Sequence, residues 1–141
     1  MHRSGLSLIE VLVVLVLIGV LLGTAFPPFI ASRDRAAVRS AVTAAVAAFD
    51  AARTLALTRA RHAAVRIDTA AGRLVVHAAA DTVLRLAMGP AWGVRLSASR
   101  DSSGVAPDGL GYGAANLRLV IRRGGAADTL TVSRLGRVTR R

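Results

Sequence analysis

The sequence predicts an α+β protein in which one long N-terminal helix packs on a small antiparallel β-sheet domain. Two patterns support this prediction: residues 6–61 are first apolar and then amphipathic with helical spacing, and the hydrophobic period then changes to two. We expect four segments: a leader at residues 1–5, a hydrophobic helix at 6–28, an amphipathic helix at 29–61 and a β domain at 62–141.

The hydrophobic segment is long enough to span a membrane. It runs from Leu6 to Phe26 and is followed by Pro27 and Pro28. At about 1.5 Å per residue its 21 residues form a helix of roughly 31 Å, close to the hydrocarbon thickness of roughly 30 Å. Arg3 in the short leader favours a cytoplasmic N-terminus, so we expect the chain to cross the membrane once.

Glu10 is out of place in a plain membrane anchor. A carboxylate within a spanning helix costs on the order of 2.5–3.5 kcal/mol, so it normally has a partner. Cleavage after Gly5 would give Leu6 a charged amine, four residues before Glu10 and on the same helix face. The amine could belong to the same chain or to the next subunit, and in the second case assembly itself neutralises the carboxylate. The alternative is that Glu10 lies near enough to the cytoplasmic surface to reach water.

The run Gly5-Leu6-Ser7-Leu8-Ile9-Glu10-Val11 resembles the processing motif of type IV prepilins. The resemblance implies that a prepilin peptidase cleaves after Gly5, that Leu6 is then N-methylated and that Glu10 is the assembly carboxylate. Leu6 stands where the family usually has phenylalanine. The resemblance also implies an inner-membrane protein with a periplasmic C-terminal domain, which then enters a filament in the periplasm or at the cell surface.

Pro27 and Pro28 mark the expected boundary between the two helical segments. Pro27 falls where pilins break their helix, and we expect a helix break at these two prolines. Beyond them, Val38, Val42 and Phe49 recur at helical spacing. This pattern predicts an amphipathic helix to about residue 61, with its apolar face covered by the β domain.

Short antiparallel strands are predicted after this helix. Alternating residues predict strands at 63–68, 73–77, 83–88, 92–98, 116–123 and 128–134, with turns at 69–72 and 124–125. Residues 100–115, rich in Ser, Gly, Asp and Pro, predict a long surface loop.

This half of the chain resembles the pseudopilin family that includes the type II secretion minor pseudopilin H (GspH) and the FimT minor pilins. The matching features are the helix end Ala52-Arg53…Ala60-Arg61…Val65, the stretch Pro107-Asp108-Gly109-Leu110-Gly111 and the closing segments 117–119, 130–132 and 136–138. The resemblance implies a type IV pilin-like fold and a structural subunit of a type II secretion pseudopilus or a type IV pilus, at or near the filament tip. It implies as partners the prepilin peptidase, other pilins or pseudopilins and the inner membrane.

No constellation typical of catalysis or metal binding is found in the sequence. His2, His62 and His77 are scattered, so we expect hydrogen-bonded structural roles for the last two, while His2 would be lost with the leader. There is no cysteine, and therefore no disulfide or thiolate metal site. We expect no enzymatic activity, no catalytic residue, no metal, no cofactor and no small-molecule substrate.

The chain is strongly basic, with a net charge of +11, and all 19 basic residues are arginine. Such an excess favours a polyanionic partner. FimT-like minor pilins that bind DNA carry a Gly-Arg-x-Arg tail, which the closing run Gly136-Arg137-Val138-Thr139-Arg140-Arg141 resembles with its second arginine one position later. The alternative function is therefore a minor pilin that binds double-stranded DNA during uptake in natural transformation. Its candidate DNA-binding residues are Arg122, Arg123, Arg134, Arg137, Arg140 and Arg141.

Two other interpretations stay open. The arginines could form a solvated face in a protein with a general bias toward arginine. The whole chain could also be a membrane-anchored domain that never assembles, which would require no cleavage after Gly5.

Overall fold

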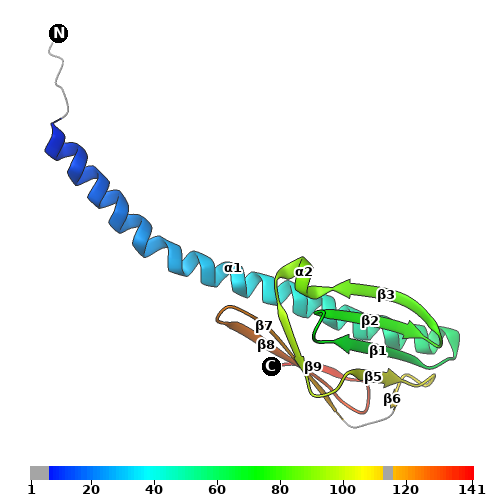
Figure 1. Ribbon diagram of the computed structural model, residues 1–141. Helices are drawn as coiled ribbons and strands as arrows, with labels where there is room; N and C mark the ends of the chain where they lie inside the picture. Colours follow the sequence, from blue (N-terminus) through cyan, green and yellow to red (C-terminus); the bar gives the residue numbers. More distant parts are fainter. Residues whose placement is uncertain (1–6, 113–115) are drawn as a thin grey trace. The chain divides into compact units, whose positions relative to one another are not determined.

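The computed structural model describes residues 7–112 and 116–141, without the side chains of residues 24–27. The chain comprises two compact units, Met1–Arg33 and Asp34–Arg141. Helix α1, Leu8–Arg59, contributes to both, and Figure 1 shows the strands that belong to the second unit.

Helix α1 is continuous, so the predicted break at Pro27 and Pro28 is wrong. A proline removes one backbone donor, but its φ of about −65° is itself helical. The hydrogen bonds of the neighbouring turns can therefore carry the helix past both residues. The expected boundary between residues 28 and 29 does not exist as a change in secondary structure, and the helix ends at Arg59 instead of residue 61.

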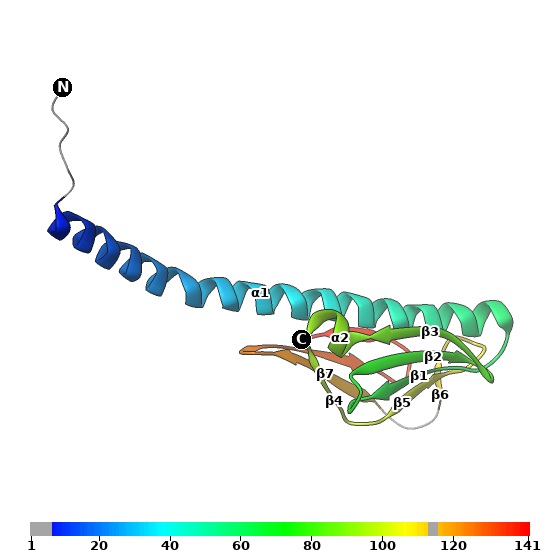
Figure 2. The ribbon, with the colours of Figure 1, turned by 45° about the horizontal axis from the view of Figure 1, so that its top comes forward.

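The later part of α1 provides one side of the core. Figure 2 shows this part lying along the strands of the second unit. Its buried residues follow the predicted stripe, and most are alanines, which let the helix backbone approach the strands closely. The buried helix residues are Val38, Ala41, Val42, Ala45, Ala48, Phe49, Ala52 and Ala56.

The second unit contains two antiparallel sheets. The first sheet has the order β3-β2-β1-β5-β6, formed by β1 (Ala63–Asp68), β2 (Arg73–Ala78), β3 (Asp81–Ala87), β5 (Ser102–Val105) and β6 (Gly111–Tyr112). The second has the order β4-β7-β8-β9, formed by β4 (Arg95–Ala98), β7 (Leu117–Arg123), β8 (Ala126–Val132) and β9 (Val138–Arg140). The predicted fold class is confirmed.

Strands β1, β2, β7 and β8 bury alternate residues in the core that they form with α1, as a period of two requires. Val65 and Leu74 come from the first sheet, and Leu119, Ile121 and Leu130 from the second; all are fully buried or nearly so, in one cluster with the helix stripe. No described polar or charged side chain is buried. Most polar residues of the strands lie on the opposite faces of the two sheets.

Three details differ from the prediction. Residues 88–92 form a short helix, α2 (Met88–Trp92), which ends at Gly93 with a φ of 63°, so Trp92 is not in a strand. The predicted loop at 100–115 contains β5 and β6, because a Ser- and Gly-rich segment still supplies backbone hydrogen bonds to β1. The arginine-rich C-terminus forms β9, which pairs with β8.

One ion pair fixes α1 to the second sheet. The Arg123 Nε donates to Asp34 Oδ1 at 3.0 Å, and the two side chains are only 25% and 15% exposed. Arg123 Nη1 also donates to the carbonyl oxygen of Trp92 in α2. Gly124 follows with a φ of 52°, and a Cβ at this position would collide with Asp34 Oδ2. Helix, hairpin and α2 thus meet at one polar junction, which we call the Asp34–Arg123 junction.

Candidate functional site

Ser7 caps the start of α1. Its hydroxyl oxygen accepts a hydrogen bond from the Glu10 backbone N–H at 3.3 Å, and its carbonyl oxygen accepts from the N–H groups of Glu10 and Val11. The spacing Ser-x-x-Glu before an apolar run is the sequence signature of a capping box. This signal was available in the sequence and would have placed the helix start at Leu8. Gly5 and Leu6, the predicted cleavage and methylation residues, lie outside the described residues.

Glu10 lies in the first turn of α1 and is exposed. No other residue from position 7 to position 32 carries a charged side chain. The large apolar residues around it are exposed as well, from Leu8 at 84% to Leu22 at 52%. A helix N-terminus stabilises a nearby carboxylate through its unpaired N–H groups and its dipole. Glu10 is therefore placed where an ionised side chain is least costly to the helix, on a surface that is otherwise apolar.

Helix α1 is long and apolar enough, by length and composition, to cross a membrane. Its apolar window lies near the N-terminus and is not covered by any described part of the chain. An exposed surface of this size needs a lipid or protein environment.

The two histidines that the structure describes have local partners. His77 Nδ1 lies 3.3 Å from the Thr82 hydroxyl, and the His62 ring lies 4.7 Å from the Tyr112 ring, centroid to centroid. Among residues 7–112 and 116–141, no group of three or more His, Asp or Glu side chains is placed to hold a metal ion.

Two of the six predicted DNA-binding arginines are engaged in ion pairs. Arg140 Nη2 lies 2.6 Å from Asp128 Oδ2, and Arg123 pairs with Asp34 at the junction described above. Arg134 and Arg137 are exposed in the turn between β8 and β9. The structure therefore does not bring the six together as one cluster.

The outward face of the second sheet gathers a different set of arginines. Arg95 on β4 pairs directly with Arg122 on β7, so two like charges stand opposite each other. Arg118 lies on the same side of β7, four residues before Arg122. Arg141 exchanges two backbone hydrogen bonds with Thr129, which places it on this face as well. We call these four residues the second-sheet arginine face.

This face has no acidic strand residue, because Asp128 pairs in register with the buried Ile121 and so lies on the inner side. Like charges directly opposite each other in a sheet are destabilising, and an anion bound beside them would offset this cost. Arg95 and Arg118 were missed as site residues. Extending the period of two through the predicted strands would have found them on the outward positions.

Comparisons with known proteins agree with these features. A family model for the prokaryotic N-terminal methylation motif matches residues 1–26. No curated protein sequence matches the chain.

The structure is similar to two crystal structures of the type IV minor pilin FimU of Pseudomonas aeruginosa (strain PAO1). The first, in space group P21, has a TM-score of 0.62 at 16% identity and covers 72% of this chain and 86% of FimU. The second, in space group P65, has a TM-score of 0.60 at 15% identity and covers 73% and 91%. The chain is thus type IV pilin-like in its N-terminal motif and in its fold. Its single N-terminal apolar helix fits a pilin anchored in the inner membrane.

Proposed function

We propose that this chain is a minor pilin or pseudopilin, a structural subunit that a prepilin peptidase cleaves after Gly5 and that then enters a filament at or near its tip. The filament is a type II secretion pseudopilus or a type IV pilus. The observation that carries the proposal is the methylation motif over residues 1–26, joined to an exposed apolar segment of α1 in which Glu10 is the one charged residue between positions 7 and 32.

On this proposal the Glu10 carboxylate is first in the membrane and later in the filament. In the membrane, its cost is limited by its place in the first turn, near the cytoplasmic surface and beside unpaired N–H groups. In the filament, the carboxylate pairs with the Leu6 amine of a neighbouring subunit, which exists only after cleavage. Processing and assembly are linked in this way, because the charge that draws the subunits together is created by the cut.

The proposal makes the chain the substrate of an enzyme and not an enzyme itself. The pilin-like fold and motif support a structural role. After cleavage, the C-terminal unit stands in the periplasm and the helix remains in the inner membrane until assembly.

Replacing Glu10 with glutamine tests the assembly step. We expect E10Q to be cleaved normally, since the peptidase acts at the Gly5 junction, but to co-purify with its filament partners several-fold less than wild type. Asp50→Asn is the matched control, because Asp50 is an exposed acid on the same helix and in the other unit. Equal co-purification of E10Q and wild type would refute the proposed charge pairing.

DNA binding is a second candidate function, favoured by the second-sheet arginine face. Four arginines on one sheet face whose strands carry no outward acid can follow a phosphate backbone, with the threonines of β8 and β9 as additional donors. On this second proposal the DNA contact includes the strands and not only the Gly-Arg tail.

A double variant tests this second candidate. Arg95→Gln with Arg122→Gln should weaken duplex DNA binding and lower the slope of log K against log salt by roughly 2, because about 0.9 counterions are released per phosphate contact. Arg140→Gln is the contrasting variant, since Arg140 already pairs with Asp128 and should contribute less. Absence of DNA binding by the wild-type chain at low salt would dispose of this function and leave the filament role intact.

A further inference from the structure

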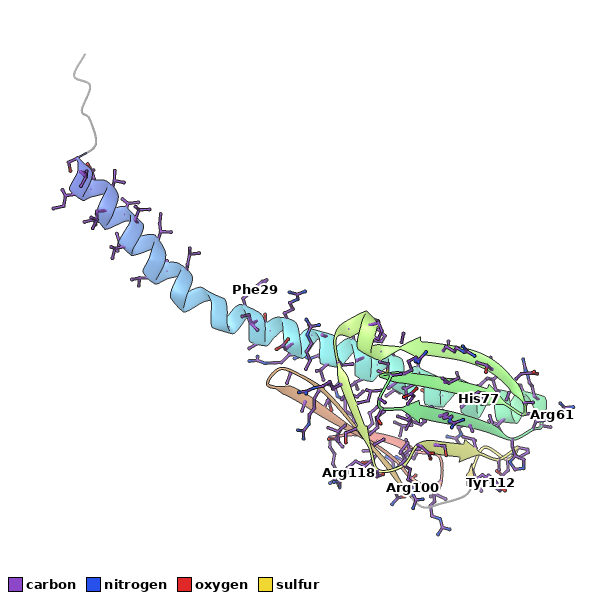
Figure 3. All side chains as sticks on the ribbon, viewed as in Figure 1. Phe29, Arg61, His77, Arg100, Tyr112 and Arg118 are labelled. Atoms are coloured by element: carbon purple, nitrogen blue, oxygen red, sulfur yellow. The ribbon has the colours of Figure 1, made fainter. Side chains whose placement is uncertain are left out.

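The outward face of the first sheet carries a second arginine site, separate from the second-sheet arginine face. It surrounds a shallow cavity of about 460 Å³, lined mainly by β1, β2 and β3. This volume is within the range of small-molecule sites, about 300–1,000 Å³. His77, labelled in Figure 3, lies on β2 at this cavity.

The strand register places one residue from each of three adjacent strands side by side at the centre of the cavity. Arg66 on β1, Val75 on β2 and Arg85 on β3 are direct neighbours across three strands. Adjacent strands are about 4.8 Å apart, so the Arg66 and Arg85 backbones are separated by roughly 10 Å. Arginine side chains are long enough for both guanidinium groups to converge above Val75. Ser102 on β5 extends the same row on the far side of Arg66.

Neither of these two arginines has an ion pair among the described residues. The acids that line the cavity are Asp68 and Asp101. Asp68 lies 3.9 Å from Arg73, and its Oδ1 accepts from the Ala71 N–H; Asp101 Oδ1 accepts from the Ser102 hydroxyl. The positive charge of Arg66 and Arg85 is therefore available to a ligand.

The arrangement of charges selects the kind of anion. The guanidinium groups of Arg66 and Arg85, on either side of Val75, suit one phosphate group, which accepts paired N–H donors. The third arginine that lines the cavity, Arg73, lies beside Asp68. The two carboxylates at the margin repel a second anionic group. Each carboxylate has more acceptor sites than its hydrogen bonds within the protein fill, so it can accept from ligand hydroxyl groups. This distribution differs from the acid-free second-sheet arginine face, which suits a polyanion.

We propose that this cavity binds a sugar phosphate: the phosphate between Arg66 and Arg85 over Val75, and the sugar hydroxyls toward Asp68 and Asp101. The site is independent of the filament role and of DNA binding. A purely structural subunit does not require such a ligand, so this site adds a separate binding function to the first sheet.

The test is titration of the full chain with glucose 6-phosphate, in a polyoxyethylene-ether detergent that contains neither phosphate nor sugar. We expect saturable binding that Arg66→Gln and Arg85→Gln each weaken by about fivefold or more, since each removes a charge-assisted hydrogen bond. Glucose should not bind, and inorganic phosphate should bind at least about fivefold more weakly, because each lacks half of the recognised chemistry.

Arg39→Gln is the matched control, as an exposed arginine outside the cavity, and should bind glucose 6-phosphate within about twofold of wild type. Both tested arginines are exposed strand residues, so either variant can report if the other fails to fold. Lack of saturable glucose 6-phosphate binding would overturn the proposal, as would wild-type affinity in both variants. Equal affinity for inorganic phosphate would overturn the assignment of the sugar.

Discussion

The Asp34–Arg123 junction provides a quantitative test of the fold. Asp34→Ala removes the carboxylate that accepts from Arg123 Nε at 3.0 Å and leaves a guanidinium that is only 25% exposed without this partner. A hydrogen bond to a charged group contributes about 1.5–3 kcal/mol, so we expect the free energy of unfolding to fall by about 2 kcal/mol. For a unit of roughly 110 residues with an unfolding entropy of about 2.1 cal/mol/K per residue, this corresponds to roughly 9 °C in Tm.

The assay is chemical and thermal unfolding of a chain that begins at Phe29. This fragment keeps the whole core, since every described buried residue lies at Val38 or later. Asp50→Ala is the control: it removes an exposed acid from the same helix, with no ion pair among the described residues, and should change stability by less than about 0.5 kcal/mol.

Gly124→Ala provides a second test of the junction, because two separate effects lower the free energy of unfolding of this variant. A φ of 52° costs an L-residue roughly 1–2 kcal/mol, and the new Cβ would also collide with Asp34 Oδ2. In an Asp34→Ala background the collision disappears and only the backbone cost remains. The two substitutions should therefore be less than additive. Full additivity, or an Asp34→Ala variant as stable as Asp50→Ala, would refute the proposed junction.

Substitutions at a close-packed glycine, at the cap of α1 and at the Asp128–Arg140 ion pair should change stability or hydrogen exchange. Gly111→Ala should destabilise the second unit by about 1–3 kcal/mol, because its Cβ would collide with the Arg134 carbonyl oxygen, whereas Gly125→Ala, with open space around it, should be near neutral by chemical denaturation. Ser7→Ala should remove the cap of α1, worth about 1 kcal/mol, and speed hydrogen exchange of the Glu10 amide in detergent roughly fivefold; unchanged exchange would argue against the cap. Asp128→Asn should weaken the docking of β9, seen as faster exchange of the Arg141 amide, while Asp81→Asn, at an exposed acid on β3 of the other sheet, should leave that amide unchanged.

The sequence alone predicted the fold class and most of its elements because both depend on hydrophobic period. The stripe from Val38 to Ala56 and the strand at 63–68 are found where the pattern placed them. The continuous helix at Pro27 and Pro28 was not predicted, since a proline tolerates helical φ and its effect depends on the surrounding turns. Strand β5 was missed because its Ser-Ser-Gly-Val sequence carries no alternation, and it is held by backbone pairing with β1.

Whether a candidate site could be predicted also depends on how its residues are brought together. The N-terminal motif is contiguous in sequence, so Gly5, Leu6 and Glu10 could be read directly. The arginine surfaces depend on register: Arg95 meets Arg122, and Arg66 meets Arg85 across Val75, through strand pairings that one sequence does not specify. Counting arginines at the C-terminus therefore gave the charge but not the face that carries it.

The central claim is that α1 is a processed assembly helix and not a permanent anchor. Intact-mass measurement of the chain expressed with a prepilin peptidase tests it most directly. We predict a mature species that begins at Leu6 and carries one additional methyl group, and its loss when Gly5 is replaced. A chain that keeps residues 1–5 in the presence of active peptidase would contradict the account.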